Sequence, residues 1–124
     1  MTERKMEELQ ILNSEKGLNL VDNDMELYKV LIDTFINESR FSIDELKEFV
    51  GKGEMKEAAS YVHAAKGAGR QLGAERLANV GQKLEDTLRG KADGNIDELC
   101  ADVAREYEEA LNAAKVFSAS CSIS

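Results

Sequence analysis

The chain contains a single histidine, His63, among 124 residues. A neutral imidazole is nucleophilic near neutral pH and can accept a transferred group covalently. Lys66 and Arg70 follow three and seven residues later, so in a helix both side chains would lie along the same flank as the imidazole. Their charges are placed to attract an anion carried by the ring. Charges on a helix flank are usually only solvated, so Lys66 and Arg70 alone are uninformative, but an exposed imidazole with these cations and open space beside it would suit an acceptor of phosphoryl groups.

Two glycines, Gly67 and Gly69, interrupt this otherwise helical segment. Each costs about 1 kcal/mol relative to alanine in a helix interior, and a violated local preference is typical of a functional site. A lone histidine on a helix flank is ordinarily only a surface residue, and close helix packing would account for Gly69, which should face inward. Neither explanation accounts for Gly67, which should face outward one turn beyond His63. We therefore expect Gly67 to clear space beside the ring.

Helical periodicity provides the elements that position these residues. Apolar residues recur at three- and four-residue spacing in five segments, namely residues 8–21, 24–50, 54–72, 74–89 and 96–117. Asn13 or Ser14 could cap a short helix within the first segment, and the second segment could break into two near Ser39 to Ser42. Since no segment alternates with a period of two, we predict no sheet.

The predicted fold is therefore all-α: an antiparallel four-helix bundle with a short N-terminal helical arm packed across one end. We expect residues 1–124 to form one domain, with its core at about residues 10–117. Residues 1–8 are expected to be a frayed, charged lead-in, and the small polar residues from Ser118 onward a loose tail.

Composition argues against several classes of protein. A formal net charge of -8 is unsuited to nucleic acid or an anionic membrane surface. No apolar run is long enough to span a membrane, and the charged start is unlike a secretory signal. Cys100 falls on an apolar stripe and Cys121 in the tail, which favours a reduced, cytoplasmic protein. No histidines or carboxylates recur at the spacing of metal ligands, so we expect no metal site.

Several fixed spacings around His63 match a known pattern together. Residues 63–67 (HAAKG) fit His-x-x-Lys-Gly, Gly73 stands ten residues after His63, and Leu84-Glu85 ends the next helical motif. In these residues the chain resembles the histidine-containing phosphotransfer (HPt) domain family. Upstream, the family's opening segment is similar to Gly17-Leu18, Asp24, Leu27-Tyr28, Leu31 and Phe35, so the resemblance covers roughly residues 10–117. Ala65 departs from the pattern, because the family often has a larger apolar residue there.

The resemblance implies roles for individual residues. His63 would be the phosphoacceptor, Lys66 would screen the phosphoryl charge, and Gly67 would admit the active site of the partner. Glu85 matches the position that hydrogen-bonds the imidazole in some family members, where it could hold one ring nitrogen as N–H. A plain surface carboxylate at Glu85 is an equally good interpretation, and Gln82 is the alternative orienting residue.

The resemblance also implies partners. The chain would be a monomeric phosphocarrier without kinase activity of its own, supplied by a sensor histidine kinase or a receiver-domain aspartate. It would pass phosphate to other response-regulator receiver domains. It would need no cofactor, since the receiver brings the aspartate and Mg²⁺. The native Met1 and short tail favour a free-standing protein.

A docking surface for such a partner should be an apolar patch around His63 with a polar rim. The candidates come from the arm and the early second helix, namely Leu9, Ile11, Leu12, Leu31, Ile32 and Phe35. The alternative function is a helical interaction module that binds signalling partners without being phosphorylated.

Overall fold

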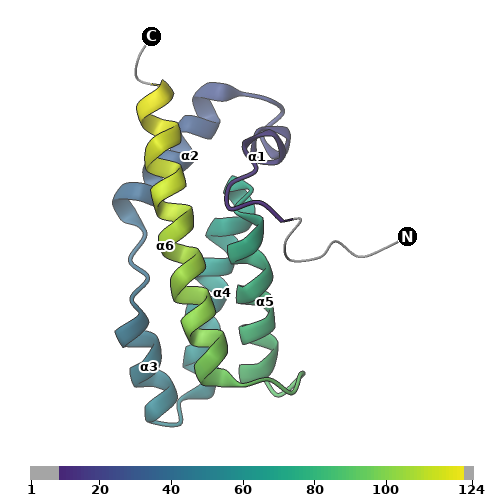
Figure 1. Cartoon of the computed structure of the whole chain (residues 1–124), viewed down its shortest axis with the longest axis vertical. Coiled ribbons are helices and arrows are strands. Elements are labelled where there is room, and N and C mark those ends of the chain that lie inside the picture. The colour runs from purple at the N-terminus through teal and green to yellow at the C-terminus, as the bar shows by residue number, and fades with distance from the viewer. Residues whose placement is uncertain (1–8, 122–124) are drawn as a thin grey trace, which may run out of the picture.

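The computed structural model describes residues 9–121, and these residues form six α-helices without any strand (Figure 1). The all-α prediction is therefore confirmed. The predicted lead-in over residues 1–8 lies outside the described residues. The helices are α1 (Ser14–Leu20), α2 (Met25–Glu38), α3 (Ile43–Gly51), α4 (Met55–Leu72), α5 (Glu75–Leu88) and α6 (Ile96–Cys121).

The long second segment breaks into α2 and α3 at the predicted place. Ser39 is the C-cap of α2, and the side chain of Ser42 caps α3 by accepting a hydrogen bond from the backbone N–H of Glu45. The intervening linker is tied to α4 by Tyr61, whose hydroxyl accepts from Ser42 N at 2.7 Å and donates to Arg40 O at 3.1 Å. The two serines on the apolar stripe therefore act as helix ends.

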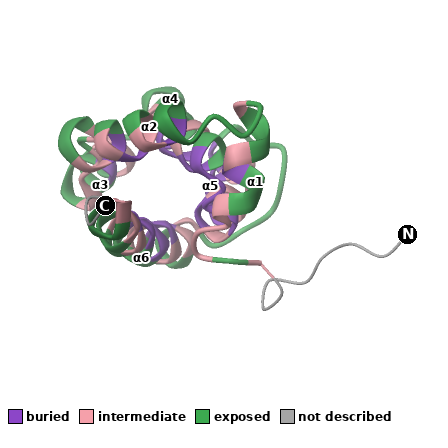
Figure 2. Cartoon of the chain, turned by 90° about the horizontal axis from the view of Figure 1, so that it is seen from above, coloured by how far each residue is buried: buried purple, intermediate pink, exposed green. Residues whose placement is uncertain are grey.

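The core is enclosed on four sides, which we call walls: α4, α5, α6, and the pair α2 and α3 (Figure 2). α4 packs on α5, α5 packs on α6, and α2 and α3 each contact both α6 and α4. This arrangement is compatible with the expected antiparallel four-helix bundle if α2 and α3 together count as one wall. α1 packs on the outside against α4 and α2. Gly73, with a left-handed φ of 84°, ends α4 and lets the chain turn directly into α5.

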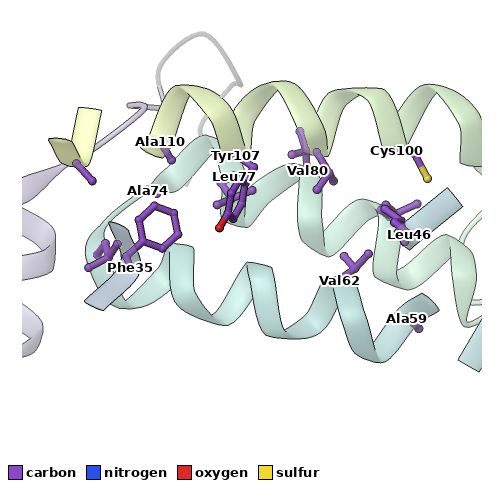
Figure 3. Packing of buried hydrophobic residues seen from close by; sticks show 14 of the residues in the cluster. Phe35, Leu46, Ala59, Val62, Ala74, Leu77, Val80, Cys100, Tyr107 and Ala110 are labelled. Atoms are coloured by element: carbon purple, nitrogen blue, oxygen red, sulfur yellow. The ribbon is translucent and has the colours of Figure 1, made fainter. Parts of the chain in front are cut away.

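Buried apolar side chains from all four walls meet between the helices (Figure 3). Val62 of α4 and Leu77 of α5 point into this core, and Phe35 of α2 packs on the ring of Tyr107 with centroids 5.4 Å apart. Cys100 is also buried there, as predicted from its stripe. Because Ile32 and Phe35 are 0% and 5% exposed, their prediction as docking residues is wrong.

The two ends of the described region compare differently with the predictions. Asn13 accepts a hydrogen bond from Lys16 N and so caps α1, which confirms one of the two caps that the sequence offered, and residues 9–13 precede that helix without helical structure. α6 continues to Cys121, so a loose tail from Ser118 is wrong for residues 118–121. The Ser118 hydroxyl donates to Asp33 Oδ1 of α2 at 2.6 Å, which holds this last turn against the bundle. Residues 122–124 lie outside the described part of the chain.

Candidate functional site

The imidazole of His63 stands in the middle of α4 on the outside of the bundle. Its side chain is 61% exposed, while the preceding residue, Val62, is fully buried. This difference follows from the rotation of about 100° per residue in a helix. The ring Nδ1 lies 3.1 Å from both carboxylate oxygens of Glu85, on the neighbouring helix α5. One edge of the ring is therefore held by the protein, and the Nε2 edge is not part of that contact.

Glu85 is a buried carboxylate at the centre of a charged cluster. Lys66 Nζ donates to its Oε1 at 2.7 Å, and Arg89 Nε donates to its Oε2 at 3.0 Å. Burial by itself would raise the pKa of Glu85, but the hydrogen bonds from Lys66, Arg89 and His63 outweigh it and lower that pKa to about 2. Glu85 is thus ionised at neutral pH, and the interpretation of Glu85 as a plain surface carboxylate is wrong.

Lys66 lies closer to the core than its position on the flank suggested. Its side chain is only 6% exposed, because the stem crosses α5 at Gly81. A Cβ atom on Gly81 would stand 3.0 Å from Lys66 Cβ, so the close passage depends on a residue without a side chain. The ammonium group reaches Glu85 and Gln82 and does not stand in the open beside the ring.

Gln82 organises the next turn of the site. Its Oε1 accepts hydrogen bonds from Lys66 Nζ and from Arg70 Nη2, both at 3.0 Å, and its Nε2 donates to Asp86 Oδ1 at 2.8 Å. These contacts hold Arg70 two turns along α4 from the imidazole. Of the two orienting residues that the sequence left open, Glu85 contacts the ring and Gln82 contacts the two cations.

The two mid-helix glycines have different surroundings. A Cβ atom on Gly69 would meet Leu77 Cδ2 at 3.2 Å, so this glycine allows α4 and α5 to approach closely. A Cβ atom on Gly67 would have nothing within 4 Å. The inward and outward positions predicted for these residues agree with this difference. Gly67 leaves open space one turn from His63. No neighbouring atom of this chain requires a glycine at that position.

Two hollows flank this part of α4 on the side of α2 and its linker to α3. One, of about 190 Å³, is lined by residues that include Leu31, Phe35, Ala68 and Gln71. The other, of about 280 Å³, is lined by residues 39–41, Tyr61, Ala64 and Ala65. Both lie on the side of α4 that faces α2 and the linker, and His63 does not line either of them.

The arm lies elsewhere. Ile11 and Leu12 line a separate hollow with Val116 and Phe117 of α6, whereas Leu9 reaches both that hollow and one beside Arg70. Ile11 and Leu12 therefore face α6 and not the imidazole, which argues against them as docking residues.

Sequence reasoning overlooked Arg89. Arg89, the C-cap residue of α5, follows Glu85 by four residues, a spacing at which opposite charges on a helix meet, and its guanidinium binds that carboxylate. The four-residue spacing between Glu85 and Arg89 was visible in the sequence. It could point to Arg89 only once Glu85 was known to be the central carboxylate of the site.

The described residues contain no group of three or more histidine, cysteine or acidic side chains that could hold a metal ion. Among the same residues, no helix combines the length and apolar character that crossing a bilayer requires.

Comparison with known proteins gives one match. No curated protein and no solved structure gives a significant match. The family model of the Hpt domain matches residues 30–115, which is more than half of the chain and includes His63, its cations and Glu85. The chain therefore belongs to the Hpt family, the histidine phosphotransfer modules of two-component signalling.

Proposed function

We propose that His63 accepts a phosphoryl group from a receiver-domain aspartate or a sensor histidine kinase and passes it to another receiver domain. The observation that carries this proposal is an exposed imidazole whose Nδ1 is held by a buried, ionised carboxylate. His63 is also the only histidine of the chain, so a histidine phosphotransfer module of this sequence has no other acceptor of that type.

Glu85 prepares the ring for nucleophilic attack. A carboxylate can only accept a hydrogen bond, so the neutral ring carries its proton on Nδ1 and keeps the lone pair on Nε2. Nε2 then attacks the phosphorus of the aspartyl phosphate. The N–P bond forms, the P–O bond to the aspartate breaks, and the aspartate carboxylate leaves with the electron pair. The Nδ1 proton stays on the ring beside Glu85, and the reverse sequence returns the group to a receiver.

The partner supplies the rest of the chemistry. We expect the receiver to bring the Mg²⁺ that neutralises its phosphoryl oxygens, while this chain supplies the imidazole and a surface to dock on. The chain then works as a phosphocarrier without kinase activity of its own. We expect residues 1–124 to act as one domain in this role.

The docking face that we propose lies between α2 and α4 and continues from the imidazole. Leu27 is 44% exposed, and helical geometry places it on the same side of α2 as Leu31, which lines the hollow shared with α4. The α4 side has small or uncharged side chains. The members of this docking face are Leu27, Leu31, Ala64, Gly67, Ala68 and Gln71.

Apolar side chains surrounding an open reactive group suit a transient protein partner. Gly67 lets the partner's aspartyl phosphate approach Nε2 closely.

Phosphoryl transfer from a panel of phosphorylated receiver domains tests the proposal. The wild-type chain should acquire a label that is labile in acid and stable in base, and His63→Gln should acquire none. The variant should still bind the same receivers, because its docking face is unchanged. A wild-type chain that binds receivers but takes no label from any of them would instead be an interaction module.

A further inference from the structure

Glu85 raises an electrostatic question for the proposed reaction. Its carboxylate lies 3.1 Å from the ring that would carry a phosphoryl group of about two negative charges. Two cations, Lys66 and Arg89, bind this carboxylate at 2.7 and 3.0 Å. One cation cancels the charge of Glu85, and the other leaves the cluster positive. Within this cluster of three charges, the attraction for a phosphoryl group therefore depends on the second cation, while Arg70 is held two turns along α4 by Gln82.

Lys66 is the cation committed to Glu85. Its side chain is 6% exposed, its Nζ also donates to Gln82 Oε1 at 3.0 Å, and Gly81 fixes the path of its stem. Turning this ammonium toward the solvent side of the ring would leave the buried carboxylate without its shortest bond. We therefore assign Lys66 to neutralising Glu85.

Arg89 has the freedom that Lys66 lacks. Its side chain is 31% exposed, and it holds Glu85 through Nε, a contact that does not use Nη1 or Nη2. A guanidinium offers five N–H donors in a planar array that fits phosphate oxygens. An alternative role for Arg89 is to interact with the dipole of α5, since it lies at the C-terminal end of that helix. That role would not require the hydrogen bond from Arg89 to Glu85.

His63 Nδ1 and Arg89 Nε lie 3.1 and 3.0 Å from the same atom, Glu85 Oε2, so the guanidinium and the imidazole are neighbours. We infer that Arg89 contacts the phosphoryl group on His63 through its Nη atoms. This inference rests on the proposed function and adds a residue to it. The phosphorylated site would then hold two ion pairs, Lys66 with Glu85 and Arg89 with the phosphoryl group.

The test is the equilibrium distribution of phosphoryl groups between this chain and a receiver domain that phosphorylates it. Arg89→Gln should shift the distribution toward the receiver by about fivefold, the size expected for one partly exposed charged contact. Arg89→Lys, which keeps the charge, should restore part of the shift. Lys83→Gln is the matched control, because Lys83 is an exposed cation on the same helix and its loss changes the net charge equally.

A second measurement separates contact with the phosphoryl group from an indirect effect through Glu85. In ¹⁵N NMR spectra of unphosphorylated Arg89→Gln, His63 should keep its Nδ1–H tautomer, because Lys66 still holds Glu85. An unchanged phosphoryl distribution would overturn the inference. A shifted distribution accompanied by a lost tautomer would also overturn it, because Arg89 would then act only by positioning Glu85. A wild-type chain that no receiver labels would refute the proposed function and this inference with it.

Discussion

Both carboxylate oxygens of Glu85 lie 3.1 Å from Nδ1 of His63. The imidazole therefore has one edge fixed across the α4–α5 interface, although most of its side chain is exposed. Since the carboxylate is itself held by Lys66 and Arg89, it cannot follow the ring if the ring rotates. The arrangement combines an accessible nucleophile with a buried support.

Glu85→Gln should slow phosphoryl transfer to His63 by about tenfold. An amide oxygen can still accept from Nδ1–H, but it loses a charge-assisted hydrogen bond, whose energy corresponds to about that factor in rate. Stopped-flow transfer from a phosphorylated receiver measures the rate, and ¹⁵N NMR reports the tautomer of His63. A rate equal to that of the wild type would show that the carboxylate charge is not needed.

The low pKa of Glu85 predicts a loss of stability in acid. Its folded-state pKa of about 2 lies below the ordinary value of 4.5, so the carboxylate stabilises the fold fully above pH 4.5. That contribution declines as the pH falls toward 2. Urea unfolding at a series of pH values should therefore show a shallower acid decline for Glu85→Gln than for the wild type.

Glu48→Gln is the control for this measurement. Glu48 also has a lowered pKa, caused by its hydrogen bond and charge interaction with Lys52, but it is exposed to solvent. Screening by water should make its contribution small. Equal changes in the two variants would contradict the importance that we assign to the buried cluster.

Gly67→Gln should slow transfer by about tenfold or more, because its side chain would occupy the space through which the partner approaches the ring. Gly67→Ala should raise the free energy of unfolding by about 0.5–1 kcal/mol, since a Cβ atom meets nothing within 4 Å and alanine favours helix. Ala101→Gln, at an exposed position on α6, is the control for adding the same side chain elsewhere. Unimpaired transfer by Gly67→Gln would contradict our account of this glycine.

The helices were largely predictable because apolar spacing and capping residues are local signals. Asp24 accepts a hydrogen bond from Leu27 N at the start of α2, as the capping sequence indicated, and the predicted break at residues 39–42 follows from two serines on the apolar stripe. The end of α6 was not predictable in this way. Its last turn is held by Ser118 against Asp33, a contact between residues far apart in the sequence.

The candidate site was predictable as a set of residues but not as a network. Spacing placed His63, Lys66 and Arg70 on one flank, yet only the structure shows that Lys66 crosses α5 at Gly81 to reach Glu85. A change of a few tens of degrees in the angular position of Lys66 around the axis of α4 decides whether its ammonium group is exposed beside the ring or buried against α5. Sequence periodicity does not resolve that difference, and it also left open whether Glu85 or Gln82 orients the imidazole.

Leu27→Glu should weaken docking without altering the chemistry at His63. The leucine is 44% exposed on the proposed docking face, so the change should raise KM for a phosphorylated receiver by about tenfold and leave kcat nearly unchanged. Val116→Glu is the control, because Val116 is 68% exposed on α6, away from that face. Equal effects of both variants would indicate a general response to added negative charge.

An ion pair between the partly exposed Arg76 and the buried Glu106, on the other side of α5, should matter for stability and not for transfer. Arg76 Nη2 donates to Glu106 Oε2 of α6 at 2.9 Å, and the Glu106 side chain is 1% exposed. Arg105 Nη2 lies farther from the same oxygen, at 3.5 Å. Removing Arg76 therefore leaves the buried Glu106 carboxylate with only the more distant Arg105. A buried charge that loses its partner lowers the free energy of unfolding more than the removal of both charges does.

Arg76→Met should lower the free energy of unfolding by about 3 kcal/mol, and the double change Arg76→Met with Glu106→Leu should recover most of that loss. Urea denaturation of the two single variants and the double variant gives the coupling energy directly. Transfer to His63 should proceed at the wild-type rate in the folded variants, because neither residue contacts the Glu85 cluster. An Arg76→Met variant as stable as the wild type would mean that Arg105 alone compensates the charge of Glu106.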